Sequence, residues 1–527
     1  MHICRLSALL IPCFALNLID NLAAHSPEAA VGIGILDAVR STLQLHPLLQ
    51  FQQRQVDINR AVKQQRSGAF DTLLDWSAGQ SRTNSPLTEA DRLLALQEGF
   101  IAANQATNLT TLNGGAQRLL RSGILIGPHL EMDRITDNLL SRDGISRTRL
   151  SFDVTVPLWR GKGREVVTAF ERSAQINVEA SLYDLNETTA ELILSTATNY
   201  WQYVGSLEQL GIITGAEERG REFVDSVQTL INADKLPRNE INQVQANFAS
   251  RAAFRFSFEQ QVAEARNNLG LAMGLSPTQL VDLPRPSDPF PNGENQTPPS
   301  ITPDTIRSYI DAALKRRADF LSAEKKTQSA DVLRKASRNN LHPRLDLTFT
   351  SGYAALREGR RPDEFLGALF ANAHGPDAIF GLNYSFPPAN NLALGQIAEA
   401  EATYQQALLS ASEKSREIAN SVSSSLTAVY SGIERLKRTR QAVEAYQAAL
   451  EGEKDKLRLG VGSLTDMLTV ESRLTDALLD RVSAQLAYAV ALVQFRFASG
   501  TLIAPDATVH TVQQELFYSL PLPGSLK

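Results

Sequence analysis

Cysteine is almost absent from this sequence, and the only two, Cys4 and Cys13, lie within the first thirteen residues. The segment that holds them has one arginine, an apolar run from Leu6 to Leu18, and small residues at Ala23 and Ala24. This layout is typical of a secretory signal peptide, which we predict over residues 1–24. A chain that has lost this segment contains no cysteine, which excludes disulfides from its fold. Two alternatives stay open: lipid attachment at Cys13, which the preceding proline disfavours, and an ordinary buried helix.

Long hydrophobic runs are also missing after the first 24 residues. No stretch reaches the roughly 18 consecutive apolar residues that a membrane-spanning helix requires. An exported protein without such a helix is either soluble or crosses an outer membrane as a closed β-barrel, whose sequence signal is weaker in each segment.

Basic residues are not in excess, because the formal net charge is −5 and the sequence pI is about 5.9. This balance gives no electrostatic reason to expect a nucleic-acid partner. The histidines are isolated from one another, and the glycine-containing segment Arg160–Glu165 lacks the spacing of a phosphate-binding loop. We therefore predict no catalytic residues, no metal, no cofactor and no enzymatic activity.

The two halves of the sequence resemble one another. A shift of 226 positions aligns Glu240 with Asp466 and Gly274 with Gly500, and two further blocks align in the same order at shifts of 230 and 272. The change in shift indicates an insert in the first half, at about residues 81–146. The insert is either a loop beyond the sheet or a pair of extra strands.

A proline-rich segment, residues 284–303, separates the halves, because seven of its twenty residues are proline. We interpret it as an extended linker. The predicted organisation is a first repeat over residues 25–283, this linker, a second repeat over residues 304–505, and a C-terminal tail over residues 506–527.

Each half begins with a helical block, over residues 35–66 and 303–341, and continues with a pair of strands. Apolar and polar residues alternate over 150–156 and 380–386, and more briefly over 74–76 and 345–349. Such strands have one apolar and one polar face. An antiparallel sheet that covers a soluble core and a lipid-facing barrel both fit this pattern.

Proline is then absent between Pro157 and Pro237 and between Pro388 and Pro505, which favours long helices. In the second interval, glycines at 460 and 462 divide the chain into about 70 and about 38 helical residues. We predict helical hairpins that turn at Asp234 and Pro237 in the first half and at Gly460 and Gly462 in the second.

Several of these segments point to a known family. The duplicated halves, the strand ends "VPLWRGKGR" and "FPPANNLALGQ", the segment "NLHPRLDLTFTSGY", and "LRLGVGSLTDMLTVESRL" followed by "AYAVALVQFRFASGTL" resemble the TolC family of outer-membrane efflux proteins. The similarity extends from about residue 35 to 505.

This resemblance implies a mainly α-helical protein with a β-barrel part. Three copies would form a homotrimer in which each chain gives four strands to a shared outer-membrane β-barrel, continued by a long α-helical barrel in the periplasm. It also implies outer-membrane lipid, a periplasmic adaptor and an inner-membrane transporter as partners. The function implied is a passive exit channel of a tripartite efflux system in a Gram-negative-type cell.

The acids after the turns are the candidate functional residues. Glu240 and Asp466 occupy equivalent repeat positions, and a trimer would gather them around one opening, where a ring of carboxylates attracts cations. The alternative is that each acid only complements its helix dipole. In the gate that the resemblance implies, a tyrosine and an arginine tie the tips closed, but the matching positions here are Leu457 and Gly462. Contacts of Arg238 or Arg458 are the candidate replacements.

Two other functions remain open. An outer-membrane channel for type I protein secretion would have the same fold and differ in its partner and cargo. A periplasmic coiled-coil structural or adaptor protein is the alternative from another class, although such a protein has no need of two repeat-related strand pairs.

Overall fold

The computed structural model describes residues 32–139, 141–234, 237–293, 301–359, 367–370, 373–459, 461–503 and 512–521. The predicted signal peptide therefore lies outside the described part. The chain divides into two compact units. The helical unit comprises the residues up to Leu45 with residues 195–294 and 435–490, and the strand-bearing unit comprises residues 46–194, 295–434 and 491–527. Each unit takes segments from both halves of the sequence.

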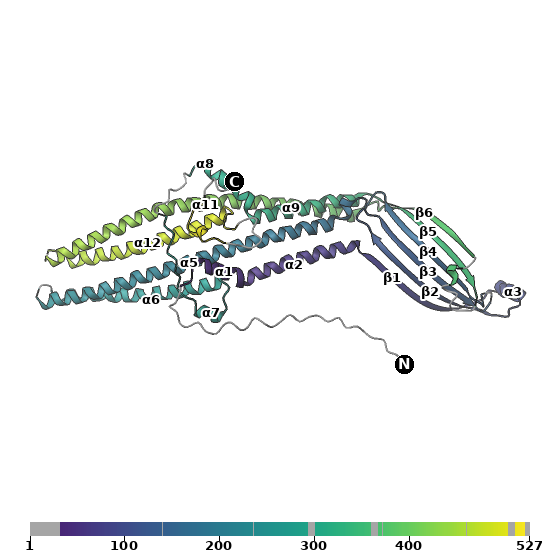
Figure 1. Cartoon of the computed structure of the whole chain (residues 1–527), viewed down its shortest axis with the longest axis horizontal. Helices are drawn as coiled ribbons and strands as arrows, with labels where there is room; N and C mark the ends of the chain where they lie inside the picture. The colour runs from purple at the N-terminus through teal and green to yellow at the C-terminus, as the bar shows by residue number, and fades with distance from the viewer. Residues whose placement is uncertain are drawn as a thin grey trace, which may run out of the picture. The chain divides into compact units, whose positions relative to one another are not determined.

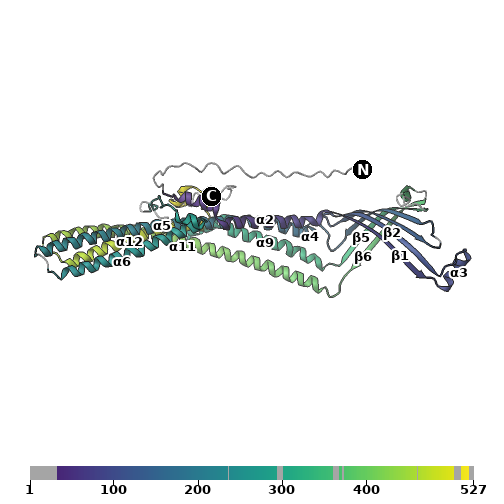
Figure 2. The ribbon, with the colours of Figure 1, turned by 90° about the horizontal axis from the view of Figure 1, so that it is seen from below.

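The strand-bearing unit contains one antiparallel sheet whose six strands follow the order of the chain (Figure 1). They are β1 (Thr72–Pro86), β2 (Asn104–Leu119), β3 (Leu125–Asp137), β4 (Ile145–Pro157), β5 (Arg344–Glu358) and β6 (Ala373–Ser385). All four predicted strand segments are confirmed. After a quarter turn of the view the strands cross one another in projection, as in a twisted sheet (Figure 2).

The insert explains why the sheet has six strands and not the four that the family resemblance implied. It holds the short helix α3 (Glu89–Gln97) and both strands of the β2–β3 hairpin. This hairpin is placed between β1 and β4, since β2 pairs with β1 and β3 pairs with β4. Of the two possibilities for the insert, the extra pair of strands is the one present.

The pairing register sorts the side chains of the sheet into two faces. Residues opposite one another on neighbouring strands lie on the same face, and the side chains of each strand alternate between the faces. Phe349 is opposite both Val154 and Phe380, and Leu150 is opposite Leu130. The apolar face carries Leu74, Trp76, Leu112, Leu130, Leu150, Phe152, Val154, Leu347, Phe349, Phe380, Leu382 and Tyr384. The polar face carries Asp75, Asn113, Glu131, Arg149, Asp153, Asp346 and Asp377.

Long helices follow each set of strands, as the proline-free intervals predicted. In the first half, α5 (Ala169–Asn232) has 64 residues and α6 (Glu240–Ala272) has 33. In the second half, α11 (Asn391–Arg458) has 68 residues and α12 (Leu464–Ala498) has 35. The matched lengths agree with a duplicated plan. Among the described residues, none of the helices combines the length and the apolar character needed to cross a bilayer.

The opening helical block of each half is broken once. In the first half it comprises α1 (Ile35–Leu45) and α2 (Pro47–Ser67), and in the second α8 (Pro303–Arg316) and α9 (Ala318–Ser337). The ring Nδ1 of His46 accepts a hydrogen bond from the Leu48 amide at 3.2 Å and so caps α2. Two shorter helices are also present, α4 (Arg164–Val167) and α7 (Pro277–Val281).

Arg317 fixes the break between α8 and α9. Its guanidinium donates to Glu187 of α5 at 2.9 Å, to Asp319 at 2.7 Å and to the carbonyl oxygen of Phe497 at 3.1 Å. The guanidinium carbon also lies 4.1 Å from the centroid of the Phe497 ring. Burial raises the pKa of the Glu187 carboxyl to about 7, although Arg317 pulls that pKa in the opposite direction.

The start of the proline-rich segment packs into the helical unit. A carboxylate oxygen of Asp288 accepts hydrogen bonds from the Ile35 amide at 2.6 Å and from the Tyr200 hydroxyl at 3.1 Å. The first of these caps the N-terminus of α1. Phe290 stacks on the buried Trp201, with ring centroids 5.7 Å apart. This part of the predicted linker is therefore ordered by specific contacts, and residues 294–300 lie outside the described residues.

Candidate functional site

The turn between α5 and α6 is built on backbone conformations that its residues tolerate. Asp234 has φ of 53°, in the left-handed region where aspartate is one of the few side chains accepted at low cost. Its amide donates to the carbonyl oxygen of Ile231 at 3.0 Å, which closes the last turn of α5. Pro237 and Arg238 are exposed, and Glu240 is half-buried as the first residue of α6.

The turn between α11 and α12 depends on Gly462. The amides of Val461 and Gly462 both donate to the carbonyl oxygen of Lys456, at 3.0 and 3.1 Å. A Cβ at position 462 would lie 2.8 Å from the backbone nitrogen of Leu457, closer than a carbon atom can approach without a shift of the backbone. Gly460 and the side chain of Arg458 lie outside the described part of the chain.

The two predicted acids lie at corresponding places in these hairpins. Glu240 and Asp466 each fall in the first helical turn after the reversal, and Asp466 is exposed. Neither carboxylate, nor the guanidinium of Arg238, has an ion-pair partner within the residues that the structure describes. First-turn acids complement the helix dipole, so the dipole alternative and the aperture prediction both remain consistent with these positions.

The hairpins meet through a small apolar core just beyond their turns. Val227 and Ile231 of α5, Val244 of α6 and Leu464 of α12 are all buried in this cluster. The contact joins a helix of the second hairpin to both helices of the first.

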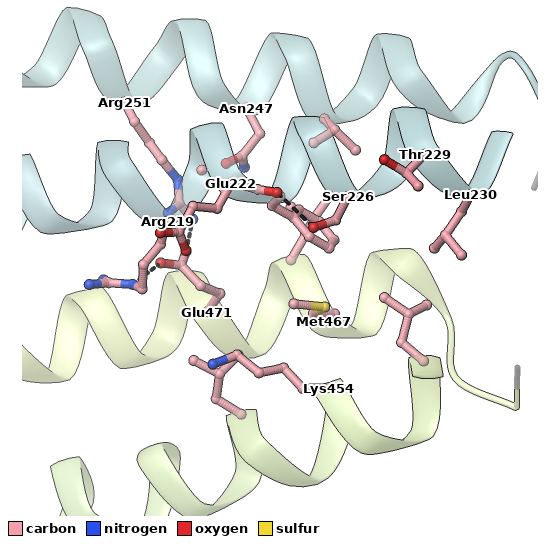
Figure 3. A pocket seen from close by; sticks show the side chains of 16 residues that line it. Arg219, Glu222, Ser226, Thr229, Leu230, Asn247, Arg251, Lys454, Met467 and Glu471 are labelled. Carbon is pink, nitrogen blue, oxygen red and sulfur yellow. Dashed lines mark hydrogen bonds and ion pairs between the residues drawn. The ribbon is translucent and has the colours of Figure 1, made fainter. Parts of the chain in front are cut away.

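An ion-pair cluster lies close to this core, and sequence reasoning did not find it. Glu471 of α12 lies between Arg219 of α5 and Arg251 of α6, so that all three side chains converge (Figure 3). The distance from Arg219 Nε to Glu471 Oε1 is 3.1 Å, and Arg251 forms an ion pair with the second carboxylate oxygen. Arg251 also donates to the carbonyl oxygen of Ala216 at 3.0 Å, and Arg219 reaches the Thr475 hydroxyl at 3.4 Å.

Burial shapes the electrostatics of this cluster. The Glu471 side chain is only 10% exposed, and that of Arg251 is 12% exposed. Loss of water around Arg251, together with the nearby charge of Arg219, lowers the pKa of the Arg251 guanidinium to about 10. Burial likewise lowers the pKa of Arg219. Both groups remain cations at neutral pH, so the carboxylate of Glu471 holds two positive charges in place.

A pocket of about 540 Å³ opens beside the cluster. Its apolar lining includes Phe223, Leu450, Leu457, Met467 and Leu468, and its polar lining includes Lys454 together with the cluster itself (Figure 3). Leu457, which the resemblance aligned with a gate tyrosine, contributes to the apolar wall of this pocket. Within the described part of the chain, no group of three or more side chains is arranged to hold a metal ion.

The position of the three residues explains why they were missed. At a shift of 226, Glu471 aligns with Gln245 and Arg251 aligns with Ala477, so the repeat comparison that selected Glu240 and Asp466 passes over them. The three charged residues lie in long helices rich in alanine and leucine, and their positions follow no regular spacing in the sequence. Only the packing of three helices brings them together.

Long helical hairpins that follow a two-faced sheet resemble the architecture of the outer-membrane channels. Residues 309–501 match the family model described as outer membrane efflux protein. The outer membrane protein TolC of Escherichia coli is 22% identical over 362 residues, which cover 68% of this chain and 70% of that protein. The second half of the chain therefore matches the outer-membrane efflux protein family, and most of the chain is similar to TolC, which is a channel and not an enzyme.

Solved structures show the same fold. The outer-membrane channel CmeC of Campylobacter jejuni superposes with a TM-score of 0.63 at 15% identity, covering 94% of both chains. The outer-membrane protein VceC of Vibrio cholerae gives a TM-score of 0.62 at 15% identity, covering 88% of this chain and 96% of that chain. The predicted fold class and outer-membrane localisation, with long helices on the periplasmic side, agree with these findings.

Proposed function

We propose that this chain is a passive exit channel that works as a homotrimer in a tripartite efflux system. The observation that carries the proposal is the sheet with one apolar and one polar face. Trp76, Phe380 and Leu382 are more than 60% exposed on the apolar face, an arrangement that a water-soluble sheet avoids. In a barrel, the apolar face would contact lipid and the polar face would line a water-filled lumen, so each face would lie in a suitable environment.

The unpaired edges of the sheet support the trimer. β1 and β6 are long edge strands with 15 and 13 residues, and exposed edges of this length invite pairing with another chain. The two edge strands run in opposite directions, so that β6 of one copy can pair antiparallel with β1 of the next. Three copies joined in this way close the barrel.

The hairpin turns are the proposed inner mouth of the duct. Glu240 and Asp466 would give up to six carboxylates around it, a ring that favours cations. The cluster of Arg219, Arg251 and Glu471 ties the two hairpins of one chain together and is a candidate for the contact that holds this mouth closed, in place of the missing tyrosine and arginine.

The partners in this proposal are a periplasmic adaptor, an inner-membrane transporter and outer-membrane lipid. The efflux assignment of the family favours export of small molecules over type I protein secretion, which uses the same kind of channel. A soluble periplasmic adaptor is disfavoured because such a protein has no use for a six-stranded sheet with an exposed apolar face.

The test is extraction from membrane fractions. We expect the protein in the outer-membrane fraction, as a trimer that resists dodecyl sulfate until it is heated, and as a conducting pore in planar bilayers. A soluble monomer from the periplasm would contradict the proposal.

A further inference from the structure

The β2–β3 hairpin is part of the wall of the sheet and not an appendage. β2 pairs with β1 over the full length from Thr72 opposite Arg118 to Pro86 opposite Asn104. β3 pairs with β4 from Leu125 opposite Thr155 to Ile135 opposite Ile145. In the second half, by contrast, the outgoing strand β5 pairs directly with the returning strand β6. The hairpin has therefore separated two strands that would otherwise be neighbours.

The hairpin also continues both faces of the sheet. Its Leu112 and Leu130 lie on the apolar face, in line with Leu150 of β4 and Ala78 of β1. On the polar face, Asn113 is opposite Glu131, which is opposite Arg149. A segment that projected into water beyond the membrane would need no such apolar face. The alternation in β3, together with the continuous pairing of β2 to β1 and β3, indicates that the hairpin crosses the same environment as the other four strands.

The turn of the hairpin is anchored where the sheet meets the helices. Arg121, in the β2–β3 turn, donates two hydrogen bonds to the carboxylate of Glu171 in α5, at 3.0 and 2.7 Å. Ser67 at the end of α2 donates to the same carboxylate at 2.9 Å. The hairpin thus returns to the helical end of the sheet, as the other strands do.

We infer that the insert widens the pore. This inference rests on the proposed trimer. Three copies of a six-stranded sheet close a barrel of eighteen strands, whereas the four duplicated strands alone would close one of twelve. Barrel diameter grows roughly in proportion to strand number, so the bore is about 1.5 times wider. Barrels of about 16 to 18 strands leave an open aqueous channel. The outer part of this duct therefore admits larger hydrophilic solutes than a four-strand design does.

The first experiment places the hairpin in the wall. Beyond residue 13 the sequence has no cysteine, so Glu131→Cys and Leu130→Cys each introduce a single thiol, on opposite faces of β3. Intact cells are treated with a charged, membrane-impermeant thiol reagent. We expect the thiol of Glu131→Cys to react and its modification to alter the bilayer conductance, while the thiol of Leu130→Cys stays protected by lipid. Equal reactivity of the two variants, or an unreactive Glu131→Cys, would overturn the inference.

The second experiment measures the width. A variant that lacks residues 87–144, with a short turn joining β1 to β4, restores four strands per chain. Hydrophilic polymers of graded size are added to the outer side of purified trimers in bilayers, and the largest polymer that enters the pore is determined. We expect the limiting radius to fall to about two-thirds of that of the complete chain. An unchanged limit would refute a role of the hairpin in the bore.

The two proposals fail in different ways. If the complete chain forms no outer-membrane trimer, the proposed function is wrong. If the complete chain conducts but the labelling pair or the polymer limit gives the contrary result, only the wider bore is wrong. Should the shortened chain not assemble, the labelling pair and the polymer limit of the complete chain still decide, because a limit that fits a twelve-stranded barrel would refute the inference.

Discussion

Replacement of Glu471 by glutamine tests whether the ion-pair cluster holds the two hairpins together. The change keeps the shape of the side chain but leaves Arg219 and Arg251 without their shared anion. Breaking a buried pair typically costs about 3–5 kcal/mol, and the partial exposure of Arg219, 34% for its side chain, favours the lower end. We therefore expect a local destabilisation of about 3 kcal/mol.

Hydrogen exchange monitored by mass spectrometry on the purified protein is the suitable assay, because the effect is local. A loss of about 3 kcal/mol corresponds to roughly a hundredfold faster exchange where local opening controls the rate. We expect this acceleration in the first turns of α12, around residues 464–475, and at the facing residues of α5. Backbone amides at the C-terminal end of α12, near Ala498, should exchange at the same rate as in the parent protein.

Glu217→Gln is the matched control. Glu217 pairs with Arg255 at 2.9 Å, but this bridge joins α5 to α6 within one hairpin, and both of its side chains are more exposed than those of Glu471 and Arg251. We expect at most a few-fold faster exchange. If Glu471→Gln leaves the exchange of α12 unchanged, or if the control has an equal effect, the cluster does not clamp the hairpins.

Three further outcomes are expected. Replacing Glu240 with glutamine and Asp466 with asparagine together should reduce the cation preference in single-channel recordings; unchanged selectivity would remove both from the aperture. Gly462→Ala should destabilise its turn by about 1–3 kcal/mol because its Cβ collides with the backbone of α11, and exchange at the turn would show this. Glu187 has a raised pKa of about 7, so its contribution to stability is present below the unfolded pKa near 4.5 and is lost as the pH rises through 7. Between pH 5 and pH 8, the free energy of unfolding of Glu187→Gln should therefore fall by about 2 kcal/mol less than that of the parent protein, as thermal unfolding at the two pH values would show. An equal fall in both proteins would exclude Glu187 as the titrating group.

The helices and the four repeat-related strands could be predicted because each has a local cause. The absence of proline extends α5 and α11, and strict alternation marks β4 and β6. The hairpin β2–β3 lacks such signals. Its first strand, "NQATNLTTLNGGAQRL", is polar on both faces over much of its length, and its second contains Gly127 and Pro128, residues that weaken a strand assignment. Pairing with β1 and β4 stabilises the extended conformation of these two segments, which their local sequence does not predict.

The candidate site divides in the same way. The turns were predictable because Gly462 allows a close backbone approach that a Cβ would block, and Pro237 fixes φ and cannot continue a helix. The repeat then aligned the acids that follow. The cluster at Glu471 depends on three helices that meet only after folding, and its residues have no counterparts in the other repeat. No spacing of residues in the sequence predicts this contact between three helices.

The cap that Asp288 provides for α1 has a consequence for the order in which the chain is assembled. Its partner Ile35 is 253 positions away, so this cap of α1 can form only after the chain has been made as far as Asp288. Long-range contacts of this kind slow folding, since the intervening chain must be ordered first. The segment that joins the two halves therefore also sets when the N-terminal cap of α1 can form.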